Sequence, residues 1–133
     1  MEIMSLTNLS QKLFSHLSEG EQKITLIARA LIKKPNILIL DEPTANLDLK
    51  SKFYVIDQIN EMTKFNSKII CITHDISMIT NIYNRIIMLK DRKIIADGTQ
   101  RETLNNKNIN NLFDINIEII KDKGNWHIYR KPK

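Results

Sequence analysis

The chain has 133 residues, 42% of them hydrophobic and 26% charged, which is the length and composition of one ordinary globular domain. Its formal net charge of +5 comes from Lys and Arg residues scattered along the chain, which argues against a dedicated nucleic-acid surface. The single cysteine excludes a disulfide framework within the chain, and the apolar runs are far too short for a membrane span.

A helix is predicted to begin at Ser18 and to end at Lys33-Lys34-Pro35. Ser18 followed by Glu21 forms a capping box, and one helix face carries Ile24, Ile27, Ala28, Leu31 and Ile32. The start of a helix offers free N–H groups to an anion, and Gly20 would let the anion approach the backbone closely. The alternative is that Ser18 and Glu21 only cap the helix. Residues 1–16 have an apolar spacing that fits one short helix or two.

The apolar run Ile37-Leu38-Ile39-Leu40 is predicted to be a strand that is buried on both faces, as central parallel strands are. Two carboxylates, Asp41 and Glu42, follow at its C-terminal end. Ligands of α/β sheets bind outside that end, so the position favours a chemical role. The alternative is an ordinary polar exit from a strand.

A second helix is expected from an N-cap at Asp48 to about Lys64. Its predicted buried face consists of Phe53, Ile56, Ile59 and Met62. A second buried strand over 69–73 follows and ends in Thr73-His74-Asp75. Two successive βα units of a parallel sheet would place Glu42 and His74 at the same edge.

This combination of side chains suits water activation at a phosphoryl group. Asp41 could hold Mg²⁺, which keeps part of its water shell, Glu42 could orient or deprotonate the attacking water, and His74 could donate to the phosphate. The alternative for His74 is a capping or core residue.

The rest of the chain is expected to contain a helix over 76–83, a hairpin of strands 85–89 and 93–96, an Asn-rich helix over 101–113, and strands over 116–120 and 126–129. The hairpin suggests an antiparallel edge on a parallel sheet. We expect the Asn clusters to reflect compositional bias.

Together these residues resemble the C-terminal part of the ATP-binding-cassette (ABC) ATPase family, in four motifs that keep the family's order. The matching segments are Leu17-Ser18-Glu19-Gly20-Glu21-Gln22-Lys23 for the signature, Ile37–Thr44 for the Walker B strand, Asn46-Leu47-Asp48 for the D-loop and Thr73-His74-Asp75 for the switch histidine.

The resemblance implies an α/β, P-loop NTPase-like partial domain, with a mainly parallel sheet flanked by helices and an antiparallel hairpin at its edge. It implies ATP and Mg²⁺ as ligands, with Glu42 as general base, Asp41 as the magnesium carboxylate and His74 as the γ-phosphate contact. The residues implied to line the nucleotide site are Ser18, Glu19, Gly20, Glu21 and Asp48. Of these, Ser18 and Gly20 would touch ATP held by the opposite subunit, and Asp48 would couple the two subunits.

The chain departs from the family pattern in two places. Glu19 stands where the signature usually has Gly, and its carboxylate would repel a triphosphate unless it points away. No Gly-x-x-x-x-Gly-Lys-Ser/Thr phosphate loop exists, since the three glycines are Gly20, Gly98 and Gly124. The chain therefore resembles the second half of a nucleotide-binding domain. Its expected parts are 1–34, the end of the helical subdomain with the signature helix; 35–100, the RecA-like core; and 101–133, a C-terminal helix and hairpin.

The resemblance implies an ATPase subunit that drives an importer, and the tail over 94–119 is similar to that of importers for iron-siderophore, haem and cobalamin. Iron chelates are the favoured cargo. The implied partners are a second ATPase subunit, a membrane permease that holds the chain at the inner face of the membrane, and a separate polypeptide that supplies the Walker A loop. Nucleic acid is not expected as a partner. The chain alone is expected to be inactive. The alternatives are a non-catalytic remnant that only binds partners and a soluble cassette ATPase of DNA maintenance, although the latter would carry a long coiled coil.

Overall fold

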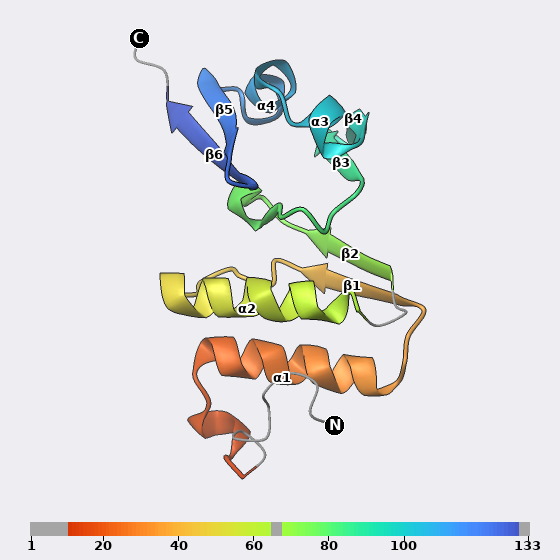
Figure 1. The fold of residues 1–133 in the computed structure, drawn as a ribbon, viewed down its shortest axis with the longest axis vertical. Helices are drawn as coiled ribbons and strands as arrows, with labels where there is room; N and C mark the ends of the chain where they lie inside the picture. The colour runs from red at the N-terminus through yellow and green to blue at the C-terminus, as the bar shows by residue number, and fades with distance from the viewer. Residues whose placement is uncertain (1–10, 65–67, 131–133) are drawn as a thin grey trace. The chain divides into compact units, whose positions relative to one another are not determined.

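The computed structural model describes residues 11–64 and 68–130. The chain divides into two compact units, Met1–His74 and Asp75–Lys133, and each unit is described by itself (Figure 1). The three segments expected from the sequence, 1–34, 35–100 and 101–133, have other boundaries than these two units, and that division stays a prediction. Most of the helical stretch expected before His16 lies outside the described residues, and its described end is the 3-10 turn η2 (Phe14–His16).

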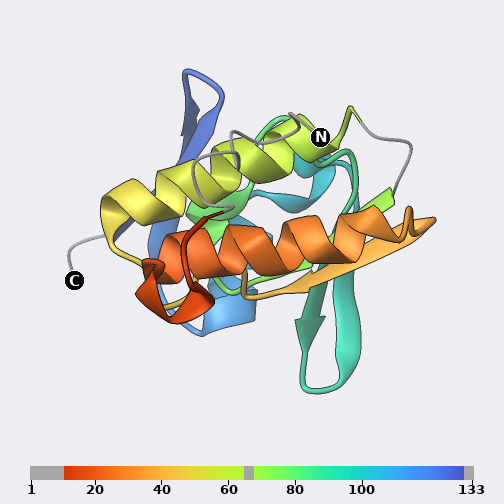
Figure 2. The same ribbon diagram turned by 90° about the horizontal axis from the view of Figure 1, so that it is seen from below.

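The first unit is a helix followed by a βαβ unit. Helix α1 spans Glu19–Ile32, strand β1 Ile37–Asp41, helix α2 Leu49–Met62 and strand β2 Lys68–Ile72. The strands pair in parallel, in a register that runs from Ile37 opposite Lys68 to Asp41 opposite Ile72. Figures 1 and 2 show α1 and α2 side by side on one side of the strand pair. The α/β class expected from the sequence is confirmed.

The core of this unit lies between the two helices and one face of the strand pair. Its buried apolar side chains are Ile24, Ile27 and Ala28 of α1, Leu38 and Leu40 of β1, and Val55, Ile56, Ile59 and Met62 of α2. Two residues that were predicted to lie in the core, Phe53 and Ile32, are exposed. Phe53 is 55% exposed, because at about 100° per residue it lies outside the arc that Val55, Ile56 and Ile59 share. Ile32, the last residue of α1, is 61% exposed.

The strands are not buried on both faces, contrary to the prediction. In β1, Leu38 and Leu40 are buried whereas Ile37, Ile39 and Asp41 are exposed, and β2 alternates between half-buried and exposed residues. The physical reason is that the helices of this unit cover only one face of the pair. A continuous apolar run therefore forms strands with one open apolar face.

The second unit consists of two antiparallel hairpins and short helices. Its elements are the 3-10 turn η3 (Ile76–Met78), β3 (Ile86–Lys90), β4 (Lys93–Gly98), α3 (Gln100–Thr103), α4 (Asn106–Phe113), β5 (Ile117–Asp122) and β6 (Asn125–Arg130). Each hairpin forms a two-stranded sheet of its own. Both two-residue loops, Asp91-Arg92 and Lys123-Gly124, have positive φ, as the primed hairpin turns require.

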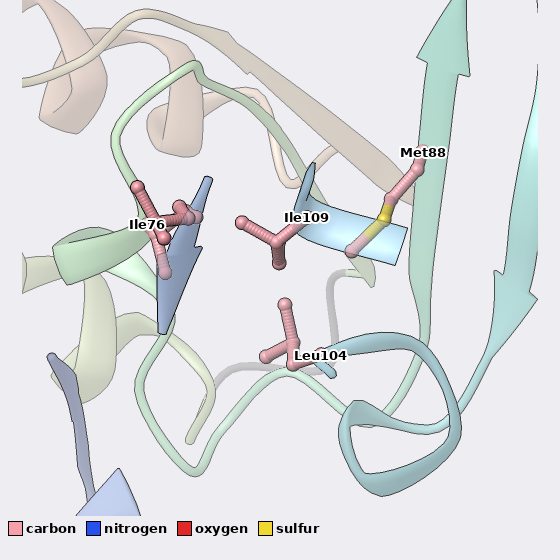
Figure 3. Close-up of a cluster of buried hydrophobic side chains, with 5 residues drawn as sticks. Ile76, Met88, Leu104 and Ile109 are labelled. Carbon is pink, nitrogen blue, oxygen red and sulfur yellow. The ribbon is translucent and has the colours of Figure 1, made fainter. Parts of the chain in front are cut away.

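A compact apolar cluster holds the second unit together. Figure 3 shows Ile76, Met88, Leu104 and Ile109 pointing toward one another, and Ile117 completes the buried set (Figure 3). The side chains come from η3, β3, the end of α3, α4 and β5, so one cluster joins five segments of the chain.

Two expected helices of this unit are wrong in extent. The helix over 76–83 is only the three-residue turn η3, since Ile79 has an extended backbone. The carbonyls of Thr80 and Tyr83 accept hydrogen bonds from the Gln100 side chain. The helix over 101–113 is interrupted at Leu104-Asn105, because Asn105 caps α4 by accepting from the Asn108 N–H.

The Asn clusters are more than compositional bias. The side-chain oxygens of Asn106 and Asn110 accept from the N–H groups of Ile119 and Ile117, at 2.8 Å each, and so fix α4 to β5. None of the helices within the described ranges is long and apolar enough to cross a membrane.

Candidate functional site

The two parallel strands bring Glu42 and His74 into contact. Glu42 follows β1 directly, and its N–H continues the ladder by donating to the Ile72 carbonyl at 2.9 Å. Its φ of 44° is unusual for a residue with a side chain and is the kind of strain that occurs at functional sites. Glu42 Oε1 lies 2.6 Å from His74 Nδ1 and accepts from the His74 N–H at 2.9 Å. The expectation that both residues share one edge is therefore confirmed in geometry, while their chemical roles stay predictions.

The environment of Glu42 favours the ionised carboxylate. Burial raises the pKa of Glu42, but hydrogen bonds from the His74 ring, the His74 N–H and the Thr73 hydroxyl together hold that pKa below its ordinary value. Because a carboxylate only accepts hydrogen bonds, the proton between the two side chains belongs to His74 Nδ1. The ring itself is exposed, with 77% of the side chain accessible.

Asp41 occupies the last position of β1, on the exposed face of the strand. Among the described residues, no group of three or more His, Cys, Asp or Glu side chains converges on a point that could hold a metal ion. An isolated carboxylate fits Mg²⁺ only when water and substrate phosphates supply the remaining ligands, which is the usual way this ion is bound.

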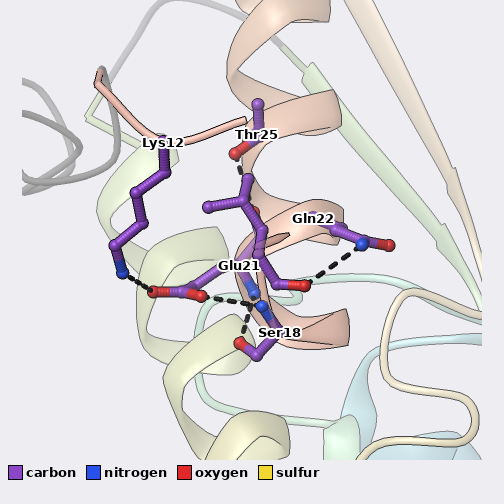
Figure 4. A network of polar contacts seen from close by, with 6 residues as sticks. Lys12, Ser18, Glu21, Gln22 and Thr25 are labelled. Carbon is purple, nitrogen blue, oxygen red and sulfur yellow. Dashed lines mark hydrogen bonds and ion pairs between the residues drawn. The ribbon is translucent and has the colours of Figure 1, made fainter. Parts of the chain in front are cut away.

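The start of α1 is a complete capping box. The Ser18 hydroxyl accepts from the Glu21 N–H at 3.3 Å, and the Glu21 carboxylate accepts from the Ser18 N–H at 2.8 Å (Figure 4). The Ser18 N–H lowers the pKa of Glu21 despite the opposing effect of burial, and the Lys12 ammonium reinforces that lowering. Both side chains therefore serve the helix end, and Glu19 beside them is exposed. Their predicted contact with a nucleotide stays a prediction.

Gly20 of α1 lies against Ser51 of α2 in the first unit. It is buried, and a Cβ added to it would meet Cβ of Ser51 in α2 at 2.9 Å. Asp48 caps α2 by accepting from the Ser51 N–H at 3.0 Å and from the Ser51 hydroxyl at 2.7 Å, and these bonds lower the pKa of Asp48. The missing side chain at Gly20 thus permits contact between the starts of α1 and α2, which is a role that the sequence argument did not anticipate.

Two contacts at the site were missed by the sequence analysis. Lys23 Nζ donates to the carbonyls of Glu42 at 3.1 Å and Ala45 at 3.0 Å, and so ties α1 to the turn after β1. Thr73 donates its hydroxyl to Glu42 Oε2 at 3.2 Å. Lys23 lies one turn after the start of α1, and Thr73 directly precedes His74. Their positions beside the motifs were the only sequence feature that could have predicted these contacts.

The sequence is similar to those of ABC transporter ATP-binding proteins. A family model described as ABC transporter matches residues 1–45. An uncharacterised ABC transporter ATP-binding protein of Methanocaldococcus jannaschii is 36% identical over 125 residues, which cover 93% of this chain and 49% of the relative. A probable iron chelatin transport ATP-binding protein of Helicobacter pylori is 30% identical over 128 residues, which cover 96% of this chain and 48% of the relative.

Solved structures agree with these relatives. A putative metal-chelate type ABC transporter in an inward-facing conformation superposes with a TM-score of 0.79 at 26% identity, over 95% of this chain and 51% of that chain. The chain belongs to the ABC transporter ATPase family. A part of the cbiONQ ABC transporter complex of Clostridium perfringens superposes with a TM-score of 0.70 at 31% identity, over 80% of this chain and 43% of that chain.

The chain spans about half the length of the curated relatives that it matches. The structural superpositions give the same proportion for the inward-facing transporter. The activity, substrates and partners of a whole ABC ATPase therefore enter only as proposals for this chain.

Proposed function

We propose that this chain supplies the signature helix, the Walker B carboxylates, the D-loop and the switch histidine of an ABC ATPase that hydrolyses ATP to drive a transporter. The contact between Glu42 and His74 carries the proposal, because it places an ionised carboxylate and an imidazole together at the C-terminal edge of a parallel strand pair. Phosphoryl transfer to water needs an acceptor for the water proton and a donor toward the phosphate, and these two side chains are of those types.

Each residue at this edge has a distinct role in the proposal. Glu42 accepts the proton of the attacking water or orients that water, and His74 holds the carboxylate in place through Nδ1 while its exposed edge faces the phosphate. Asp41 is the carboxylate that would hold Mg²⁺, which neutralises phosphate charge when bound. At the start of α1, Ser18 and Gly20 contact the ATP held by a second ATPase subunit, Glu19 and Glu21 belong to the same site, and Asp48 couples the subunits.

The Walker A loop is the missing element of this machinery, since the 133 residues contain no such motif. Without its glycine-rich backbone and lysine, the β- and γ-phosphates lack their main cradle. The proposal therefore assigns ATP turnover to an assembly of this chain with the remaining half of an ABC domain. The same absence favours a second candidate function, a partner-binding module without catalysis.

For the cargo we propose iron chelates, and for the partners a second ATPase subunit and a membrane permease that would hold the assembly at the inner face of the membrane. The Helicobacter relative named for iron chelatin transport and the metal-chelate type transporter support this choice. Loss of the chain from its host should reduce uptake of a radiolabelled ferric siderophore. Unchanged uptake of every ferric chelate tested would contradict the choice of cargo.

The catalytic assignment is tested by Glu42→Gln in an assembly that hydrolyses ATP. The amide keeps the shape of the side chain but cannot accept a proton, so turnover should fall by roughly 10²–10⁴-fold while ATP binding persists. A matched control is Glu61→Gln, which changes an exposed carboxylate near the end of α2 and should leave turnover unchanged. Wild-type turnover by the Glu42→Gln assembly would refute the role.

A further inference from the structure

The hairpin of β5 and β6 has one blocked edge and one open edge. The N–H groups of Ile117 and Ile119 in β5 donate to the side-chain oxygens of Asn110 and Asn106, at 2.8 Å each. Helix α4 therefore occupies the outer edge of β5, and covering an edge with a helix is one way in which proteins prevent the addition of further strands. Within the described residues, no strand pairs with the outer edge of β6.

The same bonds show which backbone groups of β6 point to the open edge. In an antiparallel pair, the N–H and C=O of one residue point to the same side of the strand, and the side alternates along the chain. The N–H groups of Ile117 and Ile119 point away from β6, so the backbone groups of their register partners, Arg130 and Ile128, point away from β5. Trp126 follows the same alternation. The open edge therefore offers the N–H and C=O groups of residues 126, 128 and 130 to a further strand.

The side chains of β6 do not discourage such pairing. Ile128 and Tyr129 are 44% and 53% exposed, and His127 beside them is exposed as well. Residues 125–130 contain no lysine and no proline, and the register of the hairpin has no bulge, although these are the usual devices that protect an edge strand. Arg130, the one residue of β6 that carries a full charge, lies at the end of the strand.

A second copy of the same edge fits the first. Two copies of β6 related by a two-fold axis run antiparallel, and their outward-pointing residues 126, 128 and 130 face one another. With the axis at Ile128, residues 126–130 of both copies pair, Ile128 lies opposite itself and Arg130 lies opposite Trp126 of the second copy. This register forms about six backbone hydrogen bonds, and it places no two like charges directly opposite each other.

The ring of Trp126 is suited to the arginine that this register brings to it. A guanidinium beside an indole ring forms a favourable cation–π contact. The ring already attracts a cation within the chain, because Lys121 Nζ lies 5.2 Å from its centroid. Lys121 approaches from β5, its register partner strand, so the side of Trp126 toward the open edge is left for Arg130 of the second copy.

We propose that the open edge of β6, residues 126–130, pairs antiparallel with the same edge of a second copy of this chain and joins the two hairpins into one continuous sheet. A second copy is the occupant because the register matches Ile128 with itself and each Arg130 with a Trp126. The pairing uses neither a nucleotide nor a residue to which we assign a catalytic role, so it does not rest on the proposed function.

The test is sedimentation equilibrium of the whole chain without ATP or Mg²⁺. The wild type should dimerise, and Ile128→Lys should raise the dimer dissociation constant at least tenfold, because two ammonium groups would meet at the axis. Ile128→Glu should do the same, whereas an equimolar mixture of the two variants should dimerise again. The matched control is Ile120→Lys, which places the same charge at an isoleucine of β5 that is 45% exposed and lies on the other face of the hairpin. It should dimerise like the wild type.

A wild type that stays monomeric, a dimer that persists in Ile128→Lys, or a mixture that stays monomeric would overturn the proposal. A cross-linking measurement covers the case in which the charged variants do not fold. In a Cys71→Ala background, Ile128→Cys should form a covalent dimer on mild oxidation, because the two sulfur atoms would meet at the axis, whereas Ile120→Cys should stay monomeric. Equal cross-linking of the two variants, or none in Ile128→Cys, would equally overturn it.

Discussion

At the scale of single residues, the site depends on how Glu42 is held. Its left-handed backbone follows directly from the last residue of β1, and three donors from the end of β2 converge on its carboxylate. The sequence indicated that Glu42 and His74 would meet, because their positions follow from two parallel strands. It did not indicate the strained φ or the support from Thr73, since both depend on the exact path of the turn.

The pKa of Glu42 gives a direct test of this geometry. Removing the ring with His74→Ala should raise the pKa of Glu42 toward its ordinary value, because its largest favourable hydrogen bond is lost. The carboxyl resonance of Glu42, followed by NMR during an acid titration, would measure the change. An unchanged pKa in the variant would show that the pair does not form in solution.

The same shift fixes the direction of a pH effect on stability. The pKa of Glu42 is lowered in the folded chain, so the folded state binds fewer protons at this site than the unfolded state. The stabilising contribution is fully present above the ordinary pKa of a glutamate and is lost as the pH falls through the lower folded value. Acid unfolding of His74→Ala should therefore depend less on pH in this range.

At the scale of elements, the contact between α1 and α2 at Gly20 and Ser51 was not predicted from the sequence. Gly20→Ala should lower the free energy of unfolding by about 1–2 kcal/mol, because its new Cβ would press on Ser51 and the gain in helix propensity only partly offsets this. Urea denaturation followed by circular dichroism measures the change. In a Ser51→Gly background the same substitution should be neutral or stabilising, and an equal loss in both backgrounds would contradict the contact.

Gln100 has a corresponding role in the second unit. Its amide nitrogen donates to the carbonyls of Thr80 and Tyr83 at 2.7 and 2.6 Å, and its oxygen accepts from the Trp126 ring N–H at 3.1 Å. Gln100→Glu keeps the acceptor but removes both donors, so it should destabilise this unit by about 1–3 kcal/mol. Fluorescence of Trp126, the only tryptophan, reports the unfolding. The exposed control Gln11→Glu should have no effect, and equal stability of both variants would remove this role.

Elements with strong local signals were predictable, and those decided by side-chain competition were not. The capping box at Ser18, the β1 and β2 strands and both hairpins follow from spacing and turn residues. The helix expected over 76–83 ends after one turn because Ile79 has an extended backbone, a change of direction that the apolar spacing does not reveal. The break at Asn105 depends on which of several Asn residues caps a helix, which sequence spacing alone does not decide.

At the scale of the whole molecule, the chain carries the residues to which we assign catalytic roles, and its sequence contains no phosphate-cradling loop. The apolar run 37–40 predicted a strand buried on both faces, and that prediction was wrong for the first unit because α1 and α2 cover only one face of the strand pair, which leaves Ile39 and Ile70 exposed.

The central claim is tested most directly by measuring ATP hydrolysis by the purified chain, alone and combined with the unmatched half of the Methanocaldococcus relative. The account predicts no turnover by the chain alone, turnover by the combination, and loss of that turnover with Glu42→Gln. Hydrolysis of ATP by the chain alone, or turnover by the combination that is unchanged by Glu42→Gln, would contradict it.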